Sequence, residues 1–130
     1  PNAIGPGKRP MHTIIPAMVM KGRKPAISFG VMGGAFQPMG HSHVLTNMLD
    51  HGMDPQAAID FPRVFWDQDG IVRAEAGVAD GVLDELKAMG HRVERAADPL
   101  GGAQAIVIDR ENGFLIAGSD PRKDGCALGW

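Results

Sequence analysis

The sequence predicts one domain of the α+β class with a mainly antiparallel sheet. At 130 residues, the chain is long enough for a single hydrophobic core, and 44% hydrophobic with 22% charged residues is ordinary for a globular protein. Its 18 glycines and 10 prolines separate apolar runs and form no repeat, so they mark turns. Because most of the strand-forming runs return through short turns, the strands pair as hairpins and run antiparallel.

The first predicted feature is a hairpin. Residues 14–20 are apolar and are interrupted only by Pro16, so they predict a strand with a proline near its start. Residues 21–25 predict a turn, and residues 26–31 predict the returning strand.

Two helices are predicted to follow the hairpin. Pro38 suits the first turn of a helix, and residues 41–51 carry one apolar face before Gly52 ends them. Asp54 and Pro55 are a capping residue and a first-turn proline, and they predict a second helix that ends near residue 60. The apolar face of the first helix is formed by Val44, Leu45, Met48 and Leu49.

The second half alternates strands with one helix. Residues 63–66 and 71–74 predict short strands around a turn, residues 78–89 predict a helix, and residues 91–96 predict a strand. Four side chains of this helix are expected to point inward: Val82, Leu83, Leu86 and Met89.

A second hairpin is predicted near the end of the chain. Residues 103–109 and 114–118 are its strands, and the turn between them contains Asn-Gly. Trp66, Trp130 and the methionines are expected to fill the core.

The charge pattern excludes several classes of partner. The net charge is −2, and no basic stripe or polybasic cluster predicts binding to nucleic acid or to a membrane surface. No apolar run approaches 18 residues, so no membrane span is expected. Cys126 is the single cysteine, so no internal disulfide forms, and we expect an inert thiol. Periplasmic or secreted and cytoplasmic locations both stay open.

The most informative segment is the corner at Gly33 and Gly34, between a predicted strand and a predicted helix. Adjacent glycines let the backbone turn sharply and approach a ligand, because no Cβ is present. Backbone N–H groups at such a corner lack helical partners and can point at a developing oxyanion. The alternative is a tight turn without a chemical role.

Other blocks accompany this corner in a fixed order: G-K-R-P at residues 7–10, M-G-G at 32–34 and S-D-P-R at 119–122. Together they resemble the C-terminal part of the small subunit of γ-glutamyltranspeptidases and their acylase-like relatives. The resemblance covers essentially all 130 residues. It implies part of the αββα sandwich of N-terminal-nucleophile hydrolases. It also implies partners: the large subunit and the N-terminal part of the small subunit from the same precursor.

The resemblance implies a nucleophile that this chain lacks. In the family, a precursor cuts itself, and the new N-terminal threonine attacks with its own α-amino group as base. This chain begins with Pro1, and its threonines are Thr13 and Thr46. We therefore expect the chain to start downstream of the nucleophile and to be inactive alone.

The resemblance also assigns roles to four residues near the beginning. Gly33 and Gly34 match the glycine pair whose amides form the oxyanion hole. His12 and Thr13 stand where the transpeptidases carry two serines that hold the substrate carboxylate. Because His12 has no hydroxyl, the γ-glutamyl donor is in question, and a structural role for His12 is equally open.

A second polar cluster resembles the acylase-like branch. Gln37 and His41 are expected in the substrate pocket, and either side chain is also suited to brace the corner by a hydrogen bond. His41 and His43 are two apart, and no cysteine or paired carboxylate completes a site, so neither zinc nor a cofactor is expected. Asp120 and Arg122 are expected to form a buried charge-assisted pair in the scaffold.

The leading hypothesis is a subunit of a γ-glutamyltransferase-like amidohydrolase that acts on a small-molecule amide. A glutaryl- or cephalosporin-type acylase is the close alternative. A non-catalytic fragment that binds a partner chain, or a small ligand-binding domain that folds alone, are alternatives from other classes.

Overall fold

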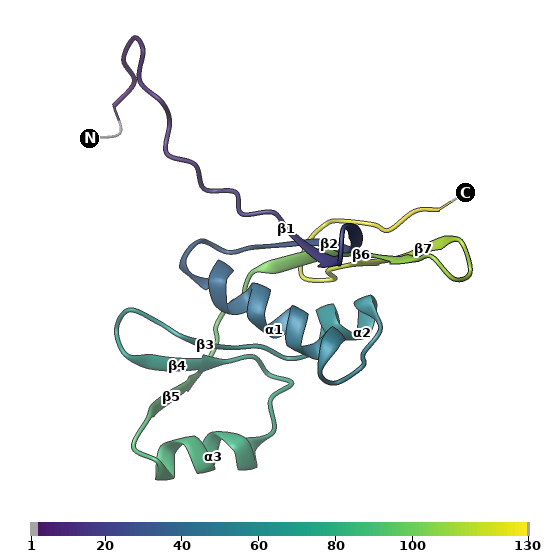
Figure 1. Cartoon of the computed structure of the whole chain (residues 1–130). Helices are drawn as coiled ribbons and strands as arrows, with labels where there is room; N and C mark the ends of the chain where they lie inside the picture. The colour runs from purple at the N-terminus through teal and green to yellow at the C-terminus, as the bar shows by residue number, and fades with distance from the viewer. Residues whose placement is uncertain (1–2, 130) are drawn as a thin grey trace.

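The structure is a computed structural model that describes residues 3–129. Its larger sheet has the strand order β1-β2-β6-β7, with every neighbouring pair antiparallel (Figure 1). The strands are β1 (Ala17–Lys21), β2 (Lys24–Met32), β6 (Gly102–Asp109) and β7 (Phe114–Ser119). Both predicted hairpins are therefore confirmed, and residues 76 positions apart in sequence pair in the middle of the sheet, as at Phe29 and Ala105.

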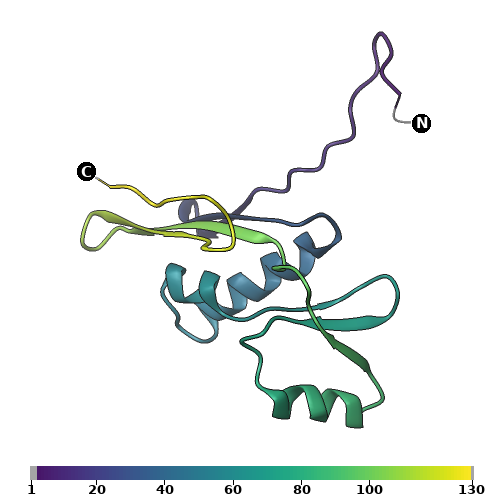
Figure 2. The same cartoon turned by 180° about the vertical axis from the view of Figure 1, so that it is seen from behind.

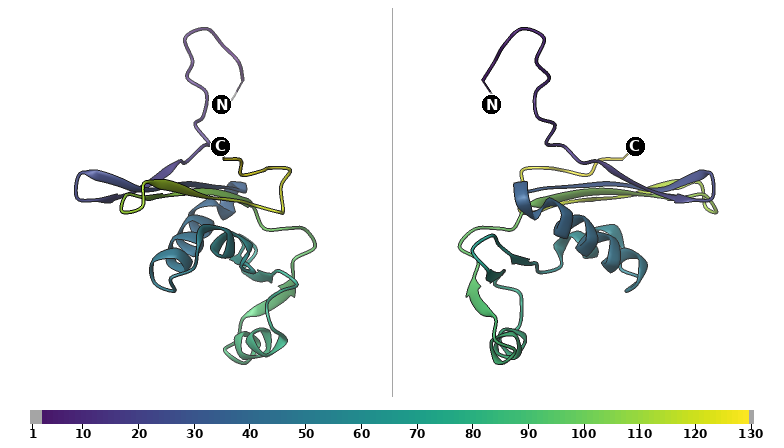
Figure 3. Two further views of the ribbon diagram at one scale, coloured as in Figure 1. Left: turned by 90° about the vertical axis from the view of Figure 1, so that its right-hand side faces the viewer. Right: turned by 60° about the vertical axis from the view of Figure 1, so that its left-hand side comes forward.

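Two helices cover one face of this sheet. A short 3-10 turn, η1 (Gly34–Phe36), leads into α1 (Gln37–Leu49), and α2 (Pro55–Asp60) follows. Edge-on, α1 and α2 lie on one side of the sheet, and the C-terminal tail crosses the other side (Figure 3). Alternate strand residues point toward the helices and form the core with them: Ile27, Phe29, Val31, Ala103 and Ala105 against Phe36, Val44, Met48, Ala58 and Ile59.

A smaller unit lies beyond the helices. It contains β3 (Val64–Trp66), β4 (Ile71–Ala74), α3 (Asp80–Ala88) and β5 (Arg92–Arg95). Strands β3 and β4 are antiparallel, whereas β4 and β5 are parallel because α3 connects them as a crossover. Seen from behind, α3 is the element farthest from the four-stranded sheet (Figure 2).

Several boundaries differ from the predictions. The first strand begins at Ala17 rather than at residue 14, directly after Pro16, which has no N–H to donate. Helix α1 has Pro38 in its first turn as predicted, but it ends at Leu49 rather than at residue 51.

The prediction of which α3 side chains point inward is only partly correct. Leu83 is buried, but Val82 is 48% exposed and Met89 is 72% exposed. Among the other elements, α3 packs mainly against β5, so only one narrow stripe of the helix is covered.

The expectation that tryptophan and methionine fill the core is wrong for Trp66 and for most methionines. Trp66 is 62% exposed, and Met18, Met20 and Met32 are also exposed. These three methionines follow the outward alternation of β1 and β2, on the sheet face that α1 and α2 leave uncovered. Trp130 lies outside the described residues. Within residues 3–129, no helix is both long and apolar enough to cross a bilayer.

Candidate functional site

The Gly33–Gly34 corner joins the end of β2 to η1. Gly33 has φ 136° and Gly34 has φ 57°, in the region that favours glycine. A Cβ on Gly33 would lie 2.9 Å from the Cα of Gly101, so this position also requires glycine for space. The Phe36 N–H donates to the Gly33 carbonyl at 3.1 Å and closes the turn.

The corner leaves two backbone donors free. Gly33 and Gly34 are exposed, and among residues 3–129 their N–H groups have no hydrogen-bond acceptor. Adjacent free amides at a rigid turn can donate to an oxygen that is brought to them.

His41 braces this corner from α1. Its Nδ1 lies 2.7 Å from the Gln37 carbonyl oxygen, and its Nε2 lies 3.4 Å from the Val31 nitrogen. The ring satisfies both contacts when Nδ1 donates and Nε2 accepts. The predicted hydrogen bond at the corner is therefore confirmed, and the assignment of His41 to the substrate pocket stays a prediction.

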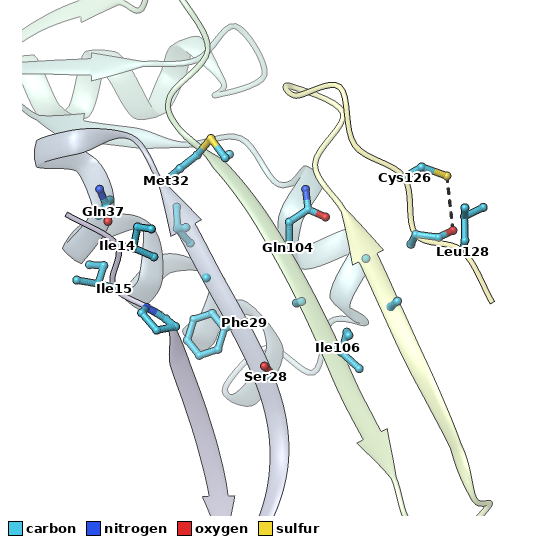
Figure 4. A pocket seen from close by; sticks show the side chains of 18 of the residues that line it. Ile14, Ile15, Ser28, Phe29, Met32, Gln37, Gln104, Ile106, Cys126 and Leu128 are labelled. Carbon is cyan, nitrogen blue, oxygen red and sulfur yellow. Dashed lines mark hydrogen bonds between the residues drawn. The ribbon is translucent and has the colours of Figure 1, made fainter. Parts of the chain in front are cut away.

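A groove of about 790 Å³ lies on the outer face of the four-stranded sheet. The N-terminal segment with Ile14 and Ile15 borders one side, and the tail with Cys126 and Leu128 borders the other (Figure 4). Its lining is mostly apolar.

The groove brings together two of the predicted site residues. Thr13 and Gln37 both line it, together with Met32, which directly precedes the glycine corner. His12 is exposed and does not line the groove. The structure thus places Thr13 and Gln37 beside one apolar space that adjoins the corner.

His43 lies on a different side of α1. Its Nε2 is 3.2 Å from Asn47 Nδ2, and its ring is 5.9 Å from the Phe61 ring. Burial, followed by the nearby Arg63 guanidinium, lowers the pKa of His43 below its ordinary value of 6.5. In the described part of the chain, no three His, Cys, Asp or Glu side chains are grouped closely enough to hold a metal ion.

A buried ion network lies behind the site. Arg63 Nη2 is 2.6 Å from Asp120 Oδ2, and both side chains are 0% exposed. The expected Asp120–Arg122 pair is present at 3.2 Å, but Arg122 makes its shorter contacts to Glu75, at 2.6 and 2.8 Å. The predicted pair is thus one edge of a four-residue network, and Arg63 and Glu75 are the members that the sequence did not indicate.

Hydrogen bonds keep both carboxylates of this network ionised. Burial alone would raise the pKa of Asp120, but bonds from the Arg122 N–H, the Arg63 guanidinium and the Ala103 N–H outweigh it and lower the pKa. Burial likewise opposes ionisation of Glu75, whose pKa is lowered by Arg122 and by backbone N–H groups.

Comparisons with known proteins match almost the whole chain to one family. The family model for gamma-glutamyltranspeptidase matches residues 1–130. The glutathione hydrolase-like YwrD proenzyme of Bacillus subtilis is 44% identical over 98% of this chain and 26% of its own length. The oxamate amidohydrolase proenzyme of Klebsiella pneumoniae is 34% identical over 98% of this chain and 26% of its own length.

Solved structures agree with the sequence comparison. The cephalosporin acylase from Bacillus halodurans has a TM-score of 0.88 and 40% identity over 98% of this chain and 24% of that chain. A gamma-glutamyltranspeptidase from Pseudomonas nitroreducens complexed with L-DON has a TM-score of 0.82 and 29% identity over 99% of this chain and 68% of that chain. These matches and the mainly antiparallel α+β architecture confirm the fold class expected for N-terminal-nucleophile hydrolases. The chain spans 26% of the length of the two curated relatives named above.

Proposed function

The chain belongs to the gamma-glutamyltranspeptidase family, and from this premise we propose that it forms part of an acyl-transferring amidohydrolase. In this proposal, the chain supplies the oxyanion hole and one wall of the substrate pocket. The observation that carries the proposal is the pair of exposed amides at Gly33 and Gly34, which have no acceptor among the residues that the structure describes.

The nucleophile is the N-terminal threonine of a processed precursor, in a segment that lies outside these 130 residues. Support comes from the family and from the curated relatives, which are proenzymes several times longer than this chain.

The reaction is a two-step acyl transfer. The threonine hydroxyl attacks the amide carbonyl, and the carbonyl oxygen becomes an oxyanion that accepts hydrogen bonds from the Gly33 and Gly34 amides. The C–N bond then breaks, and the proton removed from the hydroxyl passes to the departing amine. Water attacks the resulting ester, or an amine takes the acyl group in its place.

The acyl donor is a γ-glutamyl amide or a related amide. Thr13 in the groove offers one hydroxyl to a substrate carboxylate, and exposed His12 beside it replaces the second hydroxyl that transpeptidases carry. A glutaryl- or cephalosporin-type acylase is the second candidate, favoured by the mostly apolar groove and by 40% identity to a cephalosporin acylase. Initial rates on γ-glutamyl and glutaryl anilides distinguish these two donors.

Two glycine variants test the oxyanion hole in the protein expressed from its full open reading frame. Gly34 (φ 57°) and Gly22 (φ 62°) have matching backbone conformations, and a Cβ at either position meets nothing within 4 Å. Both alanine variants therefore impose a similar backbone strain, but only Gly34→Ala disturbs the corner.

We expect Gly34→Ala to lower kcat by about 10²–10³-fold, the typical loss for one oxyanion donor. Gly22→Ala, in the β1–β2 turn, retains the wild-type kcat. Equal kcat values for the two variants would show that the Gly33–Gly34 corner takes no part in the reaction.

A further inference from the structure

The side chain of Phe36 lies directly behind the Gly33–Gly34 corner. Phe36 is 3% exposed, and its N–H donates to the Gly33 carbonyl at 3.1 Å. Phe36 thus closes the corner with its backbone N–H, and its buried side chain holds it in place.

Three glycines from separate segments make room for the Phe36 ring. A Cβ on Gly33 would lie 3.3 Å from the ring, and a Cβ on either Gly40 or Gly101 would lie 2.6 Å from it. Gly40 lies inside α1, where glycine is unfavourable for the helix, so a requirement for space accounts for it. The ring therefore holds the corner, the helix and the β5–β6 connection at fixed separations.

Two further contacts of the ring come from β3 and from the residue directly before it. Phe65 packs edge-on against Phe36 at 5.6 Å between ring centroids, and the Arg63 guanidinium lies 5.9 Å from the Phe36 centroid. Arg63 is itself held by Asp120 at 2.6 Å. The ring is thus fixed between the glycine corner and the buried ion network.

We infer that Phe36 is a positioning residue that sets where the Gly33 and Gly34 amides point. This inference rests on the proposed function of those amides. A smaller side chain would leave space behind the corner and let the amides move, and a displacement of about 1 Å in a reacting site can cost about 10²-fold in rate. Phe36 is buried behind the corner and touches no substrate, so it acts only through the corner.

The test uses four variants of the protein expressed from its full open reading frame: Phe36→Leu, Gly34→Ala, the double variant, and Val44→Ala as a control for core truncation. Val44 is 0% exposed and lies one turn beyond Gly40 on α1, in the same core. The kcat and KM values are measured on whichever of the γ-glutamyl and glutaryl anilides the wild type cleaves, per mole of processed enzyme. Phe36→Met replaces Phe36→Leu if the leucine variant does not fold.

We expect Phe36→Leu to lower kcat by about 10–100-fold with KM within about threefold. Val44→Ala lowers the thermal midpoint but keeps kcat near the wild-type value. The double variant has a kcat within about threefold of Gly34→Ala alone, because both changes act through the same amides.

Two results would overturn the role of Phe36 and leave the proposed function intact. They are a wild-type kcat in Phe36→Leu, or a double variant in which the kcat losses of the two single variants multiply. A wild-type kcat in Gly34→Ala would instead overturn the proposed function, and this inference with it.

Discussion

Arg63 and Asp120 form a fully buried ion pair, with Nη2 and Oδ2 2.6 Å apart, across 57 residues of sequence. Asp120 Oδ2 also accepts from the Ala103 N–H at 2.7 Å, and Arg63 Nη1 donates to the Leu100 carbonyl at 2.7 Å. The pair thus ties the start of β6 to the end of β7 and to the segment before β3. Because Arg63 also lies over Phe36, the same pair supports the glycine corner from behind.

Removing one partner of this pair should be strongly destabilising. Asp120→Ala leaves the Arg63 charge buried without its carboxylate, and such losses cost about 3–5 kcal/mol. Urea unfolding of the full-length protein measures the change. Asp84→Ala is the matched control, because it breaks the exposed Asp84–Lys87 pair at 3.1 Å and should cost no more than about 0.5 kcal/mol. Similar losses in both variants would show that the buried pair contributes no more than a surface pair.

The stability that Glu75 contributes should be lost in acid. Its pKa in the folded state is lowered from an ordinary value of 4.5, so the unfolded chain takes up a proton more readily. The resulting stability is fully present above that value and is lost as the pH falls through it toward the lower folded pKa. Glu75→Gln should therefore show a shallower loss of unfolding free energy below about pH 4.5 than the wild type. If the unfolding free energy of Glu75→Gln fell with pH as steeply as that of the wild type, Glu75 would not be the group responsible.

His43 should contribute a separate pH dependence at milder acidity. Its pKa in the folded state is lowered from 6.5, so below that pH the unfolded chain binds a proton that the folded chain does not. Stability is complete above pH 6.5 with respect to this group and falls below it. His43→Gln should reduce the slope by at most about 1.4 kcal/mol per pH unit, measured by urea unfolding between about pH 7.5 and 5.5. A wild-type slope in the variant would exclude His43 as the group responsible.

The hydroxyl of Thr13 should contribute to substrate binding. Thr13→Val removes one donor to a substrate carboxylate and should raise KM by about tenfold or more, since a hydrogen bond to a charged group contributes about 1.5–3 kcal/mol. Thr46→Val is the control, because Thr46 is exposed on α1 and does not line the groove. Equal KM values for both variants would place the carboxylate elsewhere.

Local sequence signals predicted most of the fold. Turn residues and apolar runs identified both hairpins, and Asp54 with Pro55 marked the start of α2, where Asp54 Oδ1 accepts from the Ala57 N–H at 2.9 Å. These features depend on neighbouring residues, so they are visible in the chain itself. The uncovered face of α3 and the exposed methionines depend on what packs above them, which local patterns do not contain.

The candidate site divides in the same way. The Gly33–Gly34 corner was visible because two adjacent glycines after a strand are a local signal. Arg63 was missed because one arginine before a short strand carries no sign of its partner 57 residues later. Phe36 was missed because its role depends on the space left by Gly40 and Gly101. Gly101 lies in the β5–β6 connection, far from Phe36 in sequence, so no local pattern links the two residues.

The proposed role of this chain is to complete a self-processed threonine amidohydrolase. The most direct test is the intact mass and N-terminal sequence of the protein expressed from its full open reading frame. We expect two chains, the smaller of which begins with threonine and contains the whole 130-residue sequence. A single uncut chain that yields no threonine-led fragment over several days would contradict it.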